Sequence, residues 1–299
     1  MTALLFHYTS TPTAETILRT RTLRLAALSA ANDSHEGRVV GEEIDRQLRS
    51  SGLPVGVSDF VSVVAQCYPD STEGFAFCLS EKGDQLSQWR AYGDDGRGVS
   101  IGFNRSALEK DFGAVNFGRQ FYELVKISYG TKVVAEDISS ALDEMEAEFS
   151  GLGEFVRLAD GITPSDALAR LSTRNEGYGT LFVGTETISE EPIRKIMDIL
   201  ARFNKRCFAF KVEDFWEEKE WRLIRQRHKV ALQEFKYFAD DHSIRPFIEC
   251  LIADPAKHAI HSVILGPKNA TNIDWMTAFL ATVGLDHVEV KHSSITAYR

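Results

Sequence analysis

The chain has few cysteines, and their spacing fits neither a metal site nor a disulfide framework. Cys67, Cys78, Cys207 and Cys250 are the only four among 299 residues. None of them forms a Cys-x-x-Cys pair, so the common zinc motifs are excluded, and the scattered positions are unlike those of small secreted domains. We expect buried free thiols among apolar neighbours and no bound metal.

Long hydrophobic runs and a secretion signal are also missing. Hydrophobic residues make up 43% of the chain, but charges interrupt them well before the roughly 18 consecutive apolar residues that a membrane-spanning helix needs. The N-terminal sequence MTALLFHYTS has no basic segment and no long apolar segment of the kind that directs secretion. We therefore expect a cytoplasmic protein with no membrane association.

Positive charge is scarce, with 34 Lys and Arg against 43 Asp and Glu, a net charge of −9. This balance argues against non-specific binding to a nucleic-acid backbone, which needs clustered basic residues. One basic cluster does occur, formed by Arg222, Arg225, Arg227, His228 and Lys229. It could contact an anionic ligand, or it could be a solvated strand end and turn.

Several familiar catalytic motifs are absent. The sequence contains no phosphate-binding glycine loop of either common type and no His-Glu-x-x-His metal motif. These absences set aside the nucleotide-binding enzymes and metalloproteases that carry those motifs.

Hydrophobic periodicity predicts an α+β protein. Strands are expected near residues 3–7, 22–28, 74–80, 98–103, 120–129, 207–212, 220–226, 247–253, 260–265 and 287–291. Helices are expected near residues 12–20, 33–50, 84–92, 134–149 and 272–283. We predict one domain, 1–299, with a mostly antiparallel sheet and a mainly helical insertion at about 134–206.

An acidic and aromatic segment near residue 220 is the first candidate site. If it is extended, Trp216, Glu218, Glu220 and Arg222 share one face, because side chains alternate along a strand. Two neighbouring carboxylates repel unless a cation compensates them. They could stabilise positive charge on a sugar as a nicotinamide leaves, or they could form an exposed ion-pair ladder.

His7, at the end of the first predicted strand, is the second candidate. Thr9 and Ser10 place hydroxyl groups beside it, and a histidine with a hydroxyl can hold the two hydroxyls of a ribose. A partly buried structural histidine is the alternative.

Two further segments have both a structural and a functional interpretation. Trp89 and Tyr92 lie three residues apart on one predicted helix face, where they form core or a stacking surface for a nicotinamide or adenine ring. Asn32, Asp33 and Glu36 form a helix cap or a polar rim that contacts an acceptor substrate.

Together these motifs resemble an uncharacterised bacterial family called domain of unknown function 2971. The resemblance spans nearly the whole chain and by itself implies no activity. It rests on LSQWRAYGDDGRGVSIGF, Leu5-Phe6-His7-Tyr8, Asn32-Asp33 with Glu36, Trp216-x-Glu218-x-Glu220-x-Arg222 and Ser294-Ile295-x-x-Tyr298-Arg299.

The chain is also distantly similar to the ADP-ribosyltransferase superfamily, in which a His-Gly-Thr-like strand, an aromatic strand-to-helix segment and a late glutamate surround NAD. His7 and Thr9 match the first motif, with Tyr8 in place of glycine, and Glu220 matches the late glutamate with Glu218 upstream. The resemblance implies a split, mostly antiparallel sheet and NAD as substrate. It also implies catalytic roles for Glu220, His7 and Glu218, and NAD contacts from His7, Tyr8, Thr9, Ser80, Trp89, Arg90, Tyr92 and Arg222.

The implied activity is cleavage of the bond between nicotinamide and ribose, with transfer of ADP-ribose to an unknown protein or nucleic-acid acceptor. By analogy, such an enzyme acts in toxin, stress or phage-defence settings. NAD hydrolysis in the same pocket and a non-enzymatic module that binds a nucleotide or a protein are the alternatives. The catalytic hypothesis requires His7 and Glu220 to lie together on one side of the sheet.

Overall fold

The computed structural model describes residues 3–30, 36–52, 58, 61–62, 72–112, 122–149, 182–183, 186–187, 208–228, 233–239, 243–252 and 259–296. Its strands are β1 (Leu4–Thr9), β2 (Thr22–Ala27), β3 (Thr72–Ser80), β4 (Val99–Asn104), β5 (Glu123–Lys126), β6 (Ser128–Tyr129), β7 (Phe182–Val183), β8 (Glu186–Thr187), β9 (Phe210–Lys211), β10 (Glu220–His228), β11 (Lys236–Ala239), β12 (Ile244–Leu251), β13 (Ile260–Leu265) and β14 (Glu289–His292). Its α-helices are α1 (Thr11–Thr20), α2 (Glu36–Leu48), α4 (Leu86–Ala91), α5 (Arg105–Phe112), α6 (Thr131–Phe149) and α9 (Ile273–Thr282), and 3₁₀ turns form η1 (Leu28–Ala30) and η2 (Glu213–Glu218).

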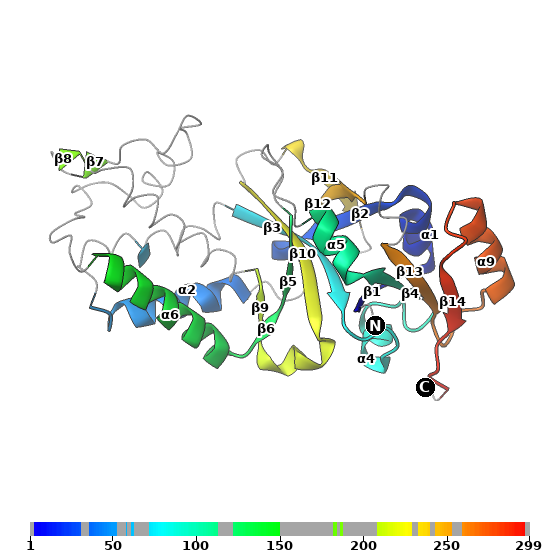
Figure 1. Ribbon diagram of the computed structural model, residues 1–299, viewed down its shortest axis with the longest axis horizontal. Coiled ribbons are helices and arrows are strands. Elements are labelled where there is room, and N and C mark those ends of the chain that lie inside the picture. Colours follow the sequence, from blue (N-terminus) through cyan, green and yellow to red (C-terminus); the bar gives the residue numbers. More distant parts are fainter. Residues whose placement is uncertain are drawn as a thin grey trace.

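Ten of these strands form one sheet (Figure 1). Eight of them follow the order β11-β12-β2-β3-β1-β4-β13-β14, while β10 pairs with β3 and β5 pairs with β10. The pairs are antiparallel except for β13 and β14. The predicted α+β class with a mostly antiparallel sheet is therefore confirmed.

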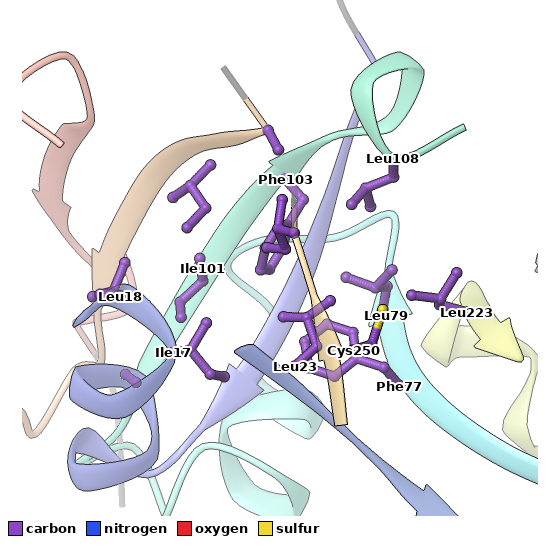
Figure 2. Close-up of a cluster of buried hydrophobic side chains, with 14 of the residues drawn as sticks. Ile17, Leu18, Leu23, Phe77, Leu79, Ile101, Phe103, Leu108, Leu223 and Cys250 are labelled. Carbon is purple, nitrogen blue, oxygen red and sulfur yellow. The ribbon is translucent and has the colours of Figure 1, made fainter. Parts of the chain in front are cut away.

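One face of this sheet carries the main hydrophobic core, where α1 packs on β2 and β4 (Figure 2). Ala14, Ile17 and Leu18 are the buried residues of α1, as their spacing predicted. The helix begins where the Ser10 side chain accepts a hydrogen bond from the Thr13 amide, with Pro12 in its first turn. Ser10 therefore caps a helix, a local role that its sequence position beside His7 did not suggest.

The long helix α6 packs beside α2 at the end of the molecule opposite α9 (Figure 1). It accounts for the first part of the insertion predicted at 134–206. The two-residue strands β7 and β8 are the other described elements there. The remainder of that insertion lies outside the described residues, as do Asn32 and Asp33 of the predicted cap.

Two cysteines can be compared with the expectation of buried thiols. Cys250 is buried in the core, as expected, whereas Cys78 is exposed. Cys67 and Cys207 lie outside the described residues. In the part of the chain that the structure describes, no group of three or more His, Cys, Asp or Glu residues could hold a metal ion, and no helix is both long and apolar enough to cross a membrane.

Candidate functional site

A cavity of about 220 Å³ opens where β1 and β3 separate. Its apolar wall comes from Phe6, Leu28 and Leu79. The polar and charged lining consists of His7, Tyr8, Cys78, Gln88, Tyr92, Lys211, Glu218, Glu220, Arg222 and Arg245. Three segments that the sequence singled out independently, around residues 7, 90 and 220, thus meet at one cavity.

The separation of β1 from β3 follows from their register. The structure describes every residue of β1 and β3, and only Phe6 and Ser80 pair between these two strands. By contrast, β1 pairs with β4 along its whole length. Beyond that pair, Nδ1 of His7 lies 2.8 Å from the carbonyl oxygen of Cys78. A side chain therefore occupies the place of the missing backbone bonds, and the gap beside it is open to the cavity.

The same register separates His7 from Glu220. Ser80 of β3 pairs with both Phe6 and Glu220, so these three side chains project from one face of the sheet. His7 follows Phe6 and projects from the other face, where its ring stacks on Phe77 at 4.0 Å between centroids. The premise that His7 and Glu220 extend from one side is therefore wrong. Both still line one cavity, because the sheet is open between β1 and β3. A ligand in that cavity can contact both side chains although they project from opposite faces, so the hypothesis now depends on the shared cavity and not on a shared face.

The expectation that Trp216, Glu218, Glu220 and Arg222 form one row on a strand is also corrected. Residues 213–218 form the 3₁₀ turn η2, and Lys219 then adopts a left-handed conformation with φ 46°. The strand begins only at Glu220. The Ser80 hydroxyl donates to the carbonyl oxygen of Glu218 at 2.7 Å, which holds the end of the turn against β3.

Glu220 is the most enclosed acidic group of the cavity. Its carboxylate accepts hydrogen bonds from Nε and an Nη of Arg222, at 2.7 and 3.3 Å, and Nζ of Lys211 lies 3.5 Å away. Burial alone raises the pKa of this carboxyl, but Arg222 and then Lys211 outweigh burial, so its pKa lies below the usual range. Glu220 is therefore an anion held by two cations.

Glu218 continues the same network towards the open part of the cavity. Lys211 Nζ lies 2.7 Å from its Oε2, and the Tyr92 hydroxyl donates to its Oε1 at 2.9 Å. Its side chain is 14% exposed, against 7% for Glu220. Burial lowers the pKa of Lys211, but Glu220 and Glu218 together raise it above its ordinary value. Lys211 therefore stays charged, and Glu218 is the carboxylate that a ligand can reach more readily.

His7 is neutral at physiological pH, since burial lowers its pKa to about 4 while the bond to Cys78 partly opposes that effect. A carbonyl oxygen can only accept a hydrogen bond, so Nδ1 must carry the proton and Nε2 is left as an acceptor. An imidazole in this state can accept a hydrogen bond from a ribose hydroxyl.

Several cavity residues were missed by sequence reasoning. Lys211 looked like the polar end of an ordinary strand. Arg245 lies in β12, which begins at Ile244, three residues before the predicted start at residue 247. Tyr129 supports the site from outside the lining: its hydroxyl accepts from the Glu220 amide at 2.7 Å, and burial raises its pKa to about 12.

Four residues predicted to contact NAD are not among those lining the cavity. Trp89 is fully buried, with its ring edge-on to Tyr8, and its core interpretation therefore holds. Ser80 and Thr9 are buried, and Arg90 is exposed. Tyr92, by contrast, lines the cavity and is 45% exposed.

Only part of the basic cluster around residues 222–229 lies at the cavity. Arg222 lies at the cavity, whereas Arg225 donates to the Tyr122 hydroxyl at 3.0 Å and Arg227 pairs with Glu234 at 2.9 Å. Lys229 lies outside the described residues. Two residues of the cluster, Arg225 and Arg227, thus contact other side chains and do not line this cavity.

Comparison with known proteins gives a similarity to one family over part of the chain and no activity. The model of the family described as "Protein of unknown function (DUF2971)" matches residues 88–223. That range includes Tyr92, Lys211, Glu218, Glu220 and Arg222, but not His7, Asn32 or Ser294. No curated protein and no solved structure matches the chain. Residues 88–223, with most of the charged wall of the cavity, are thus similar to the family of unknown function that the sequence motifs indicated.

Proposed function

We propose that the cavity binds the nicotinamide and ribose end of NAD and that the chain is an ADP-ribosyltransferase-like enzyme. The observation that carries this proposal is the meeting of His7, Glu218 and Glu220 at a single cavity. A volume of about 220 Å³ is small beside ligand pockets of roughly 300–1,000 Å³. We therefore assign the cavity to one end of the dinucleotide, with the rest lying outside it.

The roles follow from exposure and charge. Glu218 stabilises the positive charge that develops on the ribose as nicotinamide departs, because it is the more accessible carboxylate and keeps unused lone pairs. Glu220 acts through Lys211, which bridges the two acids. Nε2 of neutral His7 accepts a hydrogen bond from a ribose hydroxyl.

A second candidate is a module that binds a nucleotide without chemistry. The observation that favours it is the closed pairing of Glu220 with Arg222, since a carboxylate held on both oxygens resembles a structural ion pair. The projection of His7 from the opposite face favours it as well.

The test is nicotinamide release from NAD by the purified full chain, with and without cell lysate as a source of acceptors, beside calorimetric titration of NAD. Nicotinamide release that increases when lysate is added supports a transferase. Release that is the same with and without lysate supports an NAD glycohydrolase. Binding without release supports the second candidate. If the protein neither binds NAD nor releases nicotinamide, NAD is excluded as the ligand.

Arg245 is expected to contact the diphosphate of NAD, since it brings a further cation to the cavity lining. Arg245→Gln should weaken NAD binding about ten- to a hundredfold, the effect of losing a charged hydrogen bond. Binding of nicotinamide riboside, which has no phosphate, should not change. Calorimetric titration of both ligands measures the difference.

Arg24→Gln is the matched control. Arg24 is exposed on β2, stacks over the Phe247 ring at 5.1 Å and is not among the residues lining the cavity. Its replacement removes the same charge and should leave both affinities unchanged. Equal affinity of wild type and Arg245→Gln for NAD would remove Arg245 from the site.

A further inference from the structure

The C-terminal segment is hydrogen-bonded to the loop that begins the α4 region. The carboxylate of Asp84 accepts from the hydroxyl of Ser293 at 2.6 Å, and from the amide and the hydroxyl of Ser294, both at 2.7 Å. Residues more than two hundred positions apart are thus joined through one side chain. Figure 1 shows α4 and the end of the chain at the same edge of the molecule.

The same carboxylate also fixes α4 directly. Nε1 of Trp89 donates to Oδ1 of Asp84 at 2.8 Å, and Trp89 is completely buried against Tyr8 and Ile264. Ile295 packs against this small cluster, and its amide donates to the Ser293 hydroxyl. Asp84 therefore connects the C-terminal segment with the buried side of α4.

The other side of α4 faces the candidate site. Gln88 and Tyr92 line the cavity, and Tyr92 donates to Glu218. The helix has only six residues, and the residue before it, Gln85, makes no side-chain capping bond. Because so short a helix is unstable alone, its position depends on tertiary contacts. Apart from the Asp84 bonds, these include the Tyr8 hydroxyl, which donates to the Lys82 carbonyl and accepts from the Gln85 amide.

We propose that Asp84 is a positioning residue, which holds α4 and therefore Tyr92 in place against Glu218 by binding residues 293–294. Asp84 does not line the cavity, so it acts through α4 and not on a ligand. Burial raises the pKa of its carboxyl, but the hydrogen bonds from Ser293, Trp89 and Ser294 outweigh burial and lower it. Asp84 is therefore an anion at neutral pH, and charged acceptors form the stronger hydrogen bonds.

The experiment combines a direct measure of α4 with a catalytic one. In the Ser293→Ala/Ser294→Ala variant, native-state hydrogen exchange of the amides of residues 85–92 should accelerate at least about tenfold, since two of the bonds that hold the segment are lost. Lys291→Ala, at an exposed position on β14, is the control and should leave this exchange unchanged. An unchanged exchange rate in the double variant would overturn the proposal.

Asp84→Asn provides an independent variant with the same shape and no charge. It should accelerate exchange in residues 85–92 as well, and combining it with the serine changes should add little, because all three act on one set of bonds. Strictly additive effects would mean that Asp84 and the serines act separately, which contradicts a shared role.

The catalytic measurement rests on the proposed function and is interpreted separately. Both variants should lower kcat for nicotinamide release more than they raise KM, because Tyr92 loses its position against Glu218 while Arg245 is untouched. A wild-type protein without nicotinamide release would refute the proposed function, yet the exchange measurement would still decide whether Asp84 positions α4.

Discussion

Glu218→Gln is expected to reduce nicotinamide release by about a hundred- to a thousandfold, the effect of removing one group that stabilises transition-state charge. Glutamine keeps the shape: its oxygen can accept from Lys211 while its NH2 group donates to the Tyr92 hydroxyl, so the fold should persist. NAD affinity should change little, because the carboxylate matters most when the sugar becomes positive. Single-turnover release and calorimetric titration measure the two quantities.

Glu217→Gln is the matched control for this prediction. Glu217 is the preceding residue of η2 and is exposed, and its side chain is not among those lining the cavity. The Glu217→Gln substitution removes the same charge from the same turn and should leave nicotinamide release unchanged. If Glu218→Gln releases nicotinamide as fast as wild type, Glu218 has no catalytic role. If Glu220→Gln loses nicotinamide release while Glu218→Gln keeps it, the catalytic carboxylate is Glu220.

Arg222→Leu is expected to destabilise the protein by about 3–5 kcal/mol, because it leaves a buried carboxylate without its main partner. Arg222 is 3% exposed, donates to both oxygens of Glu220 and also donates to the Phe208 carbonyl at 3.0 Å. Lys211 remains 3.5 Å from Glu220 and already pairs with Glu218. Guanidinium unfolding of the purified variants measures the change in free energy.

The double variant Glu220→Leu/Arg222→Leu tests whether the destabilisation comes from leaving the buried Glu220 carboxylate unpaired. With both charges gone, no carboxylate is left unpaired at this position, and Lys211 keeps its bond to Glu218. The double variant should therefore be more stable than Arg222→Leu alone. A loss below about 1 kcal/mol in the single variant would contradict the importance of this pair, since water would then be solvating Glu220.

Local patterns in the sequence were sufficient to predict most elements of the sheet. The apolar face of α1 follows from a period of 3.6 residues and β2 from a period of two, whereas β3, β4, β10 and β13 follow from short runs rich in apolar and aromatic residues. All of these patterns depend on neighbours in the chain. Helix α5 and strand β11 were not predicted. The sequence analysis extended the strand back to Trp216, because Trp216, Glu218, Glu220 and Arg222 occur at every second position, whereas residues 213–218 form a 3₁₀ turn.

The sequence by itself determined the α+β class, the mostly antiparallel pairing and the segments around residues 7, 90 and 220 that meet at the cavity. Only the tertiary structure decided which side chains of those segments face one another. The pairing of Ser80 with both Phe6 and Glu220 places His7 on the opposite face, and Lys211 reaches the two acids only after the chain has folded. The physical reason is that strand register is a long-range property, and a shift of one residue would exchange the two faces of a strand.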